Sequence, residues 1–446
     1  MVNIKVAGAG AGKTTSMSNS IIESYNNSLP HRNIYCIAFT NNASDNIKEK
    51  IKSKFGCIPN RIKISTIHSF LYQEIIKPYY FLLFNKDYKK ISSIELPSDH
   101  KLSNYKINEL DKNDTLHVKA IPQRAKWVFV KKYNDTSAIK KARKIIQGAF
   151  FQYCEKIFID EAQDIDNDVF EILNEFIKLG IDINIVGDPK QDLKGFGKLD
   201  ELILKYEENI EYINICHRCP NNHISLSNSI VDDLQKQNSE KSNGKIGVAF
   251  ESDINLSSFI DSSNFDLKYI SQKNSIFNTQ KSSTSFENET LFYELEIVLK
   301  EKFPDKDENA LSNAAYFYAN KLLFVSEKNL DENKTLREVF PSVRFSSAQY
   351  ARICNAMKLS ACVDSSGIYV PSIESIKGQE GYNCLFVLTN DLASYLFQEK
   401  KEKNKTKNKL YVALTRSLKD ITLLIAKEVE NKYGKEYILK YLNKFS

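Results

Sequence analysis

Long apolar runs are missing from this 446-residue chain. No run approaches the ~18 apolar residues that a membrane-spanning helix needs. The N-terminus also lacks the basic region and apolar stretch of a secretory signal. These absences argue against an integral membrane or exported protein, and we expect a cytoplasmic protein with no membrane partner.

A complete set of zinc ligands is also missing. The eight cysteines are scattered, several of them in apolar runs, as expected of reduced thiols in a core. The stretch Cys216-His217-Arg218-Cys219, with His223 downstream, has part of a zinc spacing, but no second cysteine pair completes four ligands. We therefore interpret this stretch as structural or as part of another motif.

A strong charge imbalance, internal repeats and heptads are absent as well. The 62 basic and 56 acidic side chains leave a net charge of +6, which is compatible with nucleic-acid binding but does not argue for it alone. With 42% hydrophobic and 26% charged residues the chain is typical of globular proteins. Its length favours about three structural units.

Short β-branched runs recur along the chain, and most are followed by turn-forming or polar residues and then by a helical pattern. Such runs predict an α/β fold with parallel sheets buried on both faces. Ligands of these sheets bind beyond the carboxyl ends of the strands. The expected strands lie within residues 3–8, 34–40, 61–66, 156–164, 183–189, 384–391 and 420–426.

Three stretches interrupt this alternation. Residues 71–153 are aromatic and basic and predict a helical insertion, whereas residues 252–370 are polar, rich in Ser and Asn, and predict a second insertion whose structure stays open. The charge run 399–409, "EKKEKNKTKNK", indicates a solvated loop or helix end.

The stretch "VAGAGAGKTT" at residues 6–15 predicts a phosphate-binding loop between a strand and a helix. Backbone N–H groups and the helix end would face the phosphates, Lys13 would reach the β- and γ-phosphates, and the Thr14 hydroxyl would bind Mg²⁺. Ala7 replaces the first glycine of the general pattern, so a glycine-rich turn without a ligand is the alternative. The expected contacts are Gly8, Ala9, Gly10, Ala11, Gly12, Lys13, Thr14 and Thr15.

An acidic pair, Asp160 and Glu161, follows the apolar run at 157–159. Asp160 would join Thr14 in the Mg²⁺ shell, and Glu161 would orient or deprotonate the attacking water. Alone, such a pair could simply begin a helix, since Asp is favoured there. Together with a phosphate loop, it predicts nucleotide hydrolysis.

These residues resemble the UvrD/Rep group of superfamily 1 helicases. That group has a phosphate loop of the form A-G-A-G-S-G-K-T, which accounts for Ala7 and leaves Ala11 as the only change. The later motifs of the group are resembled, in the same order, by residues 38–51, 65–70, 160–164, 186–196, 214–224, 372–387 and 410–425.

The resemblance implies two RecA-like P-loop NTPase domains with parallel sheets, each carrying an inserted accessory segment. Residues 1–70 and 154–205 would form the first core domain, and residues 71–153 its insertion. Residues 206–251 and 371–446 would form the second core domain, and residues 252–370 its reduced insertion.

The resemblance also assigns roles to single residues. Gln191 would sense the γ-phosphate, and Arg218 and Arg416 would stabilise charge on the transferring phosphoryl group, although each arginine could instead be a surface ion-pair residue. The implied catalytic set is Lys13, Glu161, Gln191, Arg218 and Arg416, and Glu380 joins the two arginines at the nucleotide.

For DNA, the resemblance places Phe39 and Phe196 against bases, with core packing as the alternative for both rings. Trp127 is a weaker candidate for base contact. Contacts to the sugar-phosphate backbone, or support for them, would come from Thr40, Asn41, His68 and Lys377.

The chain departs from the group near the base of the nucleotide and in the coupling motifs. The group usually has a glutamine upstream of the phosphate loop that reads the adenine edge, and a tyrosine that stacks on the adenine ring. This chain leaves no room for that glutamine and has His217 in place of the tyrosine, so we expect similar KM values for ATP and GTP. Asp192-Leu193-Lys194 and Glu374 replace residues that couple nucleotide to DNA in the group, so the motifs indicate hydrolysis more directly than unwinding.

The implied activity is that of an ATP-dependent 3′–5′ translocase or helicase acting with Mg²⁺ on single-stranded or partly duplex DNA. The short insertions resemble helicase-like subunits of Gabija-type anti-phage systems, which act with an OLD-family nuclease. One alternative is a regulatory subunit of a nuclease complex that senses nucleotide and DNA with little unwinding. Another is a P-loop kinase for a small molecule, and a preference for RNA also stays open.

Overall fold

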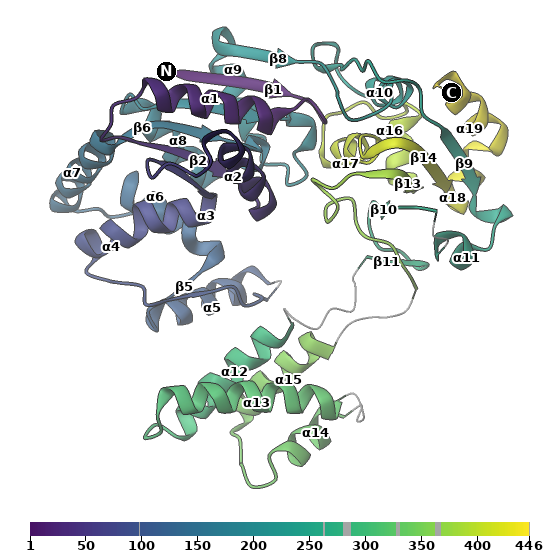
Figure 1. Ribbon diagram of the computed structural model, residues 1–446. Helices are drawn as coiled ribbons and strands as arrows, with labels where there is room; N and C mark the ends of the chain where they lie inside the picture. The colour runs from purple at the N-terminus through teal and green to yellow at the C-terminus, as the bar shows by residue number, and fades with distance from the viewer. Residues whose placement is uncertain (98, 262–263, 280–286, 327–330, 362–366, 446) are drawn as a thin grey trace. The chain divides into compact units, whose positions relative to one another are not determined.

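The computed structural model describes residues 1–446 except 98, 262–263, 280–286, 327–330, 362–366 and 446. The chain divides into two compact units, each made of separate stretches (Figure 1). The core unit contains residues 1–88, 120–273 and 370–446, and the accessory unit contains residues 89–119 and 274–369. No helix in the described part of the chain is both long and apolar enough to cross a membrane.

Six parallel strands form the first sheet of the core unit. The pairing of Ile4 with Ile185 and of Cys36 with Phe158 brings strands from distant parts of the sequence together. Mostly apolar, buried strands of this kind are typical of parallel sheets covered on both faces. Their spatial order is β3 (Ile62–Thr66), β2 (Asn33–Ala38), β6 (Cys154–Ile159), β7 (Asp182–Gly187), β1 (Val2–Ala7) and β8 (Ile210–Ile213).

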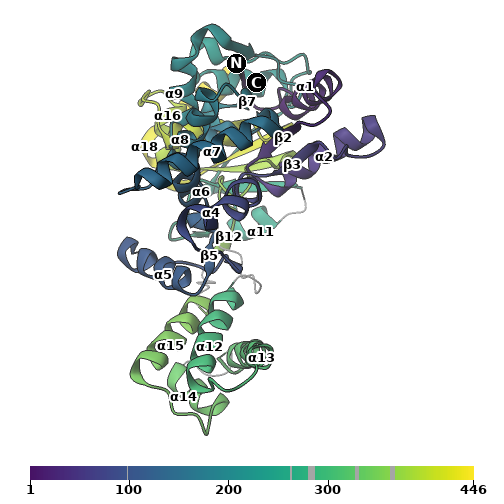
Figure 2. The same cartoon turned by 90° about the vertical axis from the view of Figure 1, so that its left-hand side faces the viewer.

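Two different layers cover this sheet. On one face, α1 (Lys13–Asn27) and α2 (Asn41–Phe55) pack their apolar side chains against Ala7, Cys36 and Phe158. The other face carries a cluster of aromatic rings in edge-to-face and stacked contact. In one stacked pair, the ring centroids of Phe150 and Phe176 lie 5.0 Å apart. Its helices are α3 (Ile67–Phe70), α6 (Ile121–Phe129), α7 (Ser137–Tyr153) and α8 (Asn167–Lys178), of which α6, α7 and α8 lie together in Figure 2.

A second parallel sheet lies in the same unit. Its strand order is β10 (Leu267–Ile270), β13 (Gly381–Leu388), β14 (Ser417–Ile425) and β9 (Ile246–Phe250). An apolar core joins this sheet to α10 (Asn221–Asn228), α16 (Asn390–Leu396), α17 (Lys405–Leu414) and α19 (Lys435–Leu442). Every strand predicted from the sequence lies in one of the two sheets, which confirms the predicted α/β class.

The boundaries between domains differ from the sequence-based ones in two places. Strand β8, within the stretch expected to begin the second domain, is the edge strand of the first sheet. Residues 71–88 and 120–153 of the expected first insertion belong to the core unit, where η1 (Leu71–Ile76), α4 (Lys77–Phe84), α6 and α7 lie. Only residues 89–119 of that stretch belong to the accessory unit.

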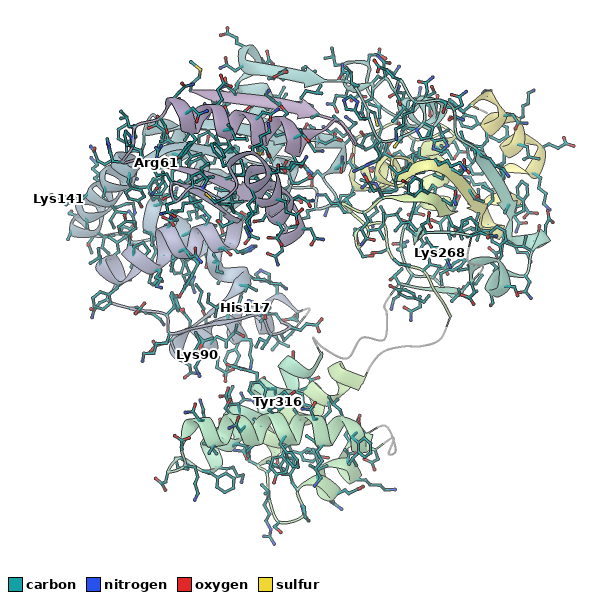
Figure 3. All side chains as sticks on the ribbon, in the orientation of Figure 1. Arg61, Lys90, His117, Lys141, Lys268 and Tyr316 are labelled. Atoms are coloured by element: carbon teal, nitrogen blue, oxygen red, sulfur yellow. The ribbon has the colours of Figure 1, made fainter. Side chains whose placement is uncertain are left out.

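The accessory unit combines a short segment with a helical bundle. The bundle core is formed by side chains of α12 (Glu287–Lys302), α13 (Glu308–Ser326), α14 (Glu332–Val339) and α15 (Ser347–Ala361). Tyr316 on α13, labelled in Figure 3, is 66% exposed. The short segment adds β4 (Lys90–Ser92), α5 (His100–Lys112) and β5 (Thr115–His117), and the long one adds β11 (Phe277–Asn278) and β12 (Ile368–Tyr369).

Ion pairs join the two segments of the accessory unit. Lys106 of α5 bonds Glu294 of α12, and the two side chains are only 13% and 11% exposed. Arg352 of α15 contacts the same Glu294 at 2.8 Å and Glu109 of α5 at 3.1 Å. Glu294 is therefore a buried anion that needs cations from both segments.

Candidate active site

The carboxyl ends of the first sheet gather most of the residues singled out in the sequence. Because all six strands are parallel, the loops after β1, β6 and β7 lie at one edge of the sheet. These loops carry residues 8–12, 160–164 and 188–197. The phosphate loop, the acidic pair and Gln191 therefore belong to one region.

The phosphate loop leads from β1 directly into α1. Gly10 and Gly12 have φ angles of 69° and 73°, in the left-handed region where glycine is favoured. Gly12 immediately precedes the first helical residue, Lys13, whose Nζ lies 3.4 Å from the carbonyl oxygen of Ala7. The loop thus presents a helix N-terminus and an ammonium group to the same space, as anion binding requires.

Asp160 and Glu161 stand at the end of β6, and their backbone is held in an unusual conformation. The amide of Asp160 donates to the carbonyl oxygen of Ile37 at 2.9 Å. Glu161 has a φ of 54° although it is not glycine, and its amide donates to the Asp160 carboxylate at 3.0 Å. Such left-handed residues cost about 1–3 kcal/mol and cluster at functional sites.

The two carboxyl groups differ in their electrostatics. Burial, followed by the charge of Glu161, raises the pKa of Asp160 to about 7. Burial alone would also raise the pKa of Glu161, but the charges of Lys13 and Lys377 outweigh it and hold that pKa below its ordinary value. Glu161 is therefore the ionised member of the pair.

The residues around Asp160 fit a magnesium ion. Asp160 is 1% exposed and hydrogen-bonds with the side chain of Thr14. A buried carboxylate with a raised pKa is the group that a nearby cation would stabilise in its ionised form. No cluster of three or more His, Cys, Asp or Glu among the described residues could hold a metal alone. A carboxylate and a hydroxyl suit Mg²⁺, which takes its remaining ligands from water and phosphate.

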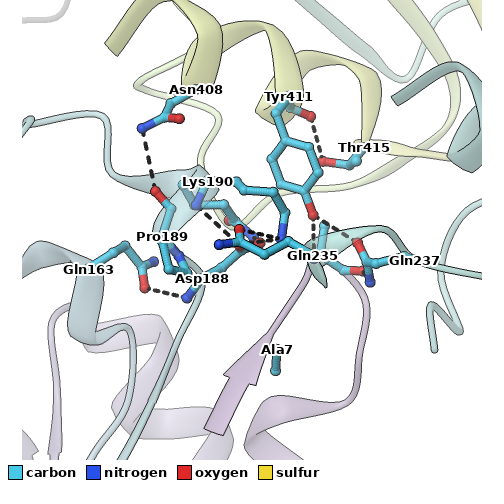
Figure 4. Close-up of polar contacts among 12 residues, drawn as sticks. Ala7, Gln163, Asp188, Pro189, Lys190, Gln235, Gln237, Asn408, Tyr411 and Thr415 are labelled. Carbon is cyan, nitrogen blue, oxygen red and sulfur yellow. Dashed lines mark hydrogen bonds and ion pairs between the residues drawn. The ribbon is translucent and has the colours of Figure 1, made fainter. Parts of the chain in front are cut away.

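A chain of hydrogen bonds joins the acidic pair to Gln191. Gln163 donates to the Glu161 carboxylate and accepts from the amide of Asp188 at 3.0 Å. Asp188 is fully buried and accepts from Gln191 Nε2 at 2.9 Å. It also pairs with Lys190 Nζ at 3.0 Å (Figure 4). Burial would raise the pKa of Asp188, but Lys190 and Lys13 lower it. The sequence analysis did not single out Gln163 or Asp188, although they lie within the motif ranges 160–164 and 186–196.

Arg218 lies beside Gly10 of the phosphate loop, and its charge acts on Arg416. Arg416, just after α17, is 1% exposed and donates to the carbonyl oxygens of Val412 and Gln379 at 3.0 and 3.2 Å. Burial and the neighbouring charge of Arg218 lower the pKa of Arg416. Arg218 Nε lies 2.6 Å from the carboxylate of Glu380. Two neighbouring guanidinium groups, one of them buried, would be stabilised by an anion between them.

Side chains from beyond the first sheet contact the phosphate loop directly. The hydroxyl of Tyr411 on α17 accepts from the amide of Ala9 at 3.0 Å. It donates to Gln237 Oε1 at 2.8 Å (Figure 4). Gln237 Nε2 in turn donates to the carbonyl oxygen of Ala9 at 3.1 Å. Tyr411 lies within the motif range 410–425, whereas Gln237 lies in no motif and could not have been found from the sequence.

The residues predicted to bind DNA occupy the loops after β2, β3 and β7 and a turn before β13. Phe39 is half-buried, and Phe196 is 37% exposed. Thr40 caps α2 by accepting from the amide of Ala43 at 3.2 Å, and the next residue, Asn41, begins that helix. His68 lies exposed in α3, and Lys377 pairs with Asp164 at 2.7 Å.

Trp127 is half-buried on α6. The guanidinium of Arg124 lies 4.0 Å and the ammonium of Lys132 4.5 Å from its ring. The ring therefore already contacts two cations of this chain.

The fold and the site define a P-loop nucleotide-binding protein built on RecA-like sheets. Residues 2–197 match the family model described as an AAA domain. The chain is 31% identical over 192 residues to the Gabija protein GajB of Bacillus cereus (strain VD045), covering 42% of this chain and 36% of that protein. It is 24% identical over 227 residues to the ATP-dependent DNA helicase Rep of Buchnera aphidicola subsp. Schizaphis graminum (strain Sg), covering 42% and 34%.

These matches confirm the predicted resemblance of the chain to the UvrD/Rep-like helicase group, and the family model matches its N-terminal part, residues 2–197. The aligned region spans about a third of each curated relative. A solved complex of the arterivirus nonstructural protein 10 (helicase) with DNA aligns with a TM-score of 0.37 and 10% identity over 96% of this chain and 62% of that chain. That likeness is too distant to bear on function.

Proposed function

We propose that the chain is an ATP-driven DNA translocase of the UvrD/Rep type that hydrolyses ATP with Mg²⁺. The observation that carries the proposal is the continuous chain of contacts from Glu161 through Gln163 and Asp188 to Gln191. It links the residue that would activate water to the residue that would sense the γ-phosphate. A phosphate loop alone would need no such link.

Each residue of the site has a role in this proposal. The loop and Lys13 bind the triphosphate, and Thr14 and Asp160 would hold Mg²⁺, which neutralises charge on the phosphate oxygens. Glu161, ionised and fixed by Gln163, accepts a proton from the attacking water. Arg218 and Arg416 stabilise negative charge on the transferring phosphoryl group.

Movement would pass from Gln191 to α17. Asn408 of α17 donates to the carbonyl oxygen of Asp192 at 2.9 Å, so the loop that carries Gln191 is attached to this helix. Arg416 follows the same helix, and Tyr411 on it contacts the phosphate loop. Loss of the γ-phosphate can therefore shift α17, and with it both Arg416 and Tyr411.

The direct test is the rate of ATP hydrolysis with Mg²⁺ alone and with single-stranded DNA, duplex ends or RNA. We expect single-stranded DNA to raise the rate and the Lys13→Ala variant to abolish it, because the ammonium group that binds the phosphates is lost. Hydrolysis that is indifferent to every nucleic acid would overturn the proposal.

The match to the Gabija protein GajB favours a second candidate. In it, the chain is a subunit of an anti-phage nuclease complex, with an OLD-family nuclease as partner, and senses nucleotide and DNA with little unwinding. A strand-displacement assay of the isolated chain separates the two candidates. Rapid 3′–5′ unwinding supports the helicase, whereas DNA-stimulated hydrolysis without unwinding supports the sensing subunit.

Phe196 is the aromatic ring best placed to stack on a base, because it is exposed in the loop after Gln191. The Phe196→Ala variant is expected to weaken binding of single-stranded DNA by about 1–3 kcal/mol, the usual value of one base stack. Fluorescence anisotropy with a labelled oligonucleotide measures the change. Tyr437→Ala removes an aromatic ring that is 46% exposed on α19 and serves as the control. Equal affinities of both variants would remove Phe196 from the DNA path.

A further inference from the structure

The turn Cys216-His217-Arg218-Cys219, between β8 and α10, contains two thiols that the proposed function does not use. Both cysteines are buried, at 1% and 0% exposure, and form a small apolar cluster with Ile224. His223, the nearest further candidate for a metal ligand, instead shares a hydrogen bond of 2.6 Å with Ser417. Within the described residues the pair lacks the partners that a zinc site would need.

The two thiols interact with one another. The amide of Cys219 donates to the sulfur of Cys216 at 3.4 Å, which places that sulfur against the backbone of its partner. A hydrogen bond from the Cys219 thiol, with backbone N–H groups and the charge of Arg218, lowers the pKa of Cys216 to about 6. The pKa of Cys219 is raised. An acidic first thiol beside a protonated second one is the arrangement of reactive Cys-X-X-Cys pairs.

The turn also lies against the phosphate loop. A Cβ atom placed on Gly10 would lie 3.0 Å from the sulfur of Cys216 and 2.4 Å from the Cβ of Arg218. The amide of His217 donates to the carbonyl oxygen of Gly10 at 2.9 Å. Any change in the shape of this turn therefore alters the approach of Arg218 to the loop.

Both ends of the turn are held by hydrogen bonds, so a disulfide between the two cysteines would change the conformation of the residues between them. The amide of Cys216 donates to the carbonyl oxygen of Asn238 at 2.8 Å, and Ser239 Oγ donates to the carbonyl oxygen of Cys219 at 2.6 Å. His217 and Arg218, the two residues between the cysteines, are the ones left to move.

We propose that Cys216 and Cys219 form a reversible redox pair, whose disulfide displaces Arg218 from the nucleotide site and stops hydrolysis. The oxidant is a peroxide that reaches the turn from the side of His217, which is exposed. The disulfide itself does not depend on the proposed function, whereas its effect on hydrolysis rests on that function.

The chemistry balances with hydrogen peroxide as the two-electron oxidant. The Cys216 thiolate attacks one peroxide oxygen, the O–O bond breaks, and hydroxide leaves as water after taking a proton, which gives a sulfenic acid. The sulfur of Cys219 then attacks the sulfur of Cys216, the S–O bond breaks, and a second water leaves with the proton of Cys219. Two thiols and one peroxide thus yield one disulfide and two waters.

The test treats the full chain with hydrogen peroxide and then with dithiothreitol. Mass spectrometry after alkylation is expected to show a disulfide in the peptide that contains Cys216 and Cys219, and its loss on reduction. ATP hydrolysis should fall at least about tenfold on oxidation, as when an arginine contact is lost, and recover on reduction. The Cys57→Ser variant, which removes an exposed cysteine, should keep this response.

Cys216→Ser and Cys219→Ser are each compared with themselves before and after oxidation, and neither should respond. The unaltered chain decides the question even where a variant fails to fold. Absence of the disulfide, or a disulfide with undiminished hydrolysis, would overturn the proposal. If the reduced chain hydrolyses no ATP, the proposed function fails, and affinity for a fluorescent ATP analogue then becomes the readout of the switch. An affinity unchanged by the disulfide would then overturn the switch.

Discussion

The Arg416→Ala variant is expected to hydrolyse ATP about 10³-fold or more slowly than the unaltered chain, with the loss in kcat rather than in KM. Arginines that stabilise a transferring phosphoryl group contribute about 10³–10⁵ in rate. Arg416 is buried, and its pKa is lowered by burial and by Arg218. Among the described residues it donates hydrogen bonds to two carbonyl oxygens and to the hydroxyl of Thr415 rather than to a carboxylate. Its charge is therefore available to an anion in the nucleotide site.

A structural role is the competing explanation for Arg416, because its side chain also bonds the carbonyl oxygens of Val412 and Gln379. The Arg416→Lys variant keeps the charge but loses the planar set of donors, so it should retain affinity for ATP and recover part of kcat. Thermal unfolding of both variants tests the fold directly. A normal kcat in a folded Arg416→Ala protein would exclude the role in charge stabilisation.

The Glu161→Gln variant is expected to lower kcat by about 10²–10⁴, the usual contribution of a positioned general base. Glutamine has nearly the same shape, but its amide cannot take a proton from water. The pKa of Glu161 lies below its ordinary value because Lys13 and Lys377 outweigh burial, so the carboxylate is ionised at neutral pH. Affinity for ATP should remain, and the variant should trap bound nucleotide.

Single-turnover hydrolysis and equilibrium binding measure these two quantities for Glu161→Gln. The matched control is Glu201→Gln on α9 (Lys198–Lys205), which removes the charge of a carboxylate that is 50% exposed and paired with Lys198. The control should leave hydrolysis unchanged. A Glu161→Gln protein with unaltered single-turnover rates would show that another group activates the water.

The buried strands and the loops at their ends could be predicted because their signals are local. An apolar run such as 157–159 that is followed by an acidic pair indicates both a strand and a site, and Gly10 and Gly12 mark the turn before α1. Contacts between distant residues left no such signal. Gln237 reaches Ala9 across 228 positions of the chain, and nothing near Gln237 in sequence marks it.

The domain boundaries were harder to predict for a different reason. Strand β8 is an edge strand whose residues are all partly or fully exposed, so it lacks the apolar run that marks the inner strands. Residues 71–153 are predicted as one helical insertion, although the stretch also contains the short strands β4 and β5. Its pattern does not reveal which helices join the core. The separation at residues 89–119 follows from tertiary packing rather than from local preference.

The accessory unit has a consequence for how this protein can be altered. Its two segments enter and leave the core unit at four points, after residues 88, 119, 273 and 369. Glu294 is neutralised by Lys106 from one segment and by Arg352 from the other. Deleting the short segment alone would remove one of the two cations from this buried carboxylate. The unit therefore behaves as one exchangeable part, which can be lost or replaced only when both segments change together.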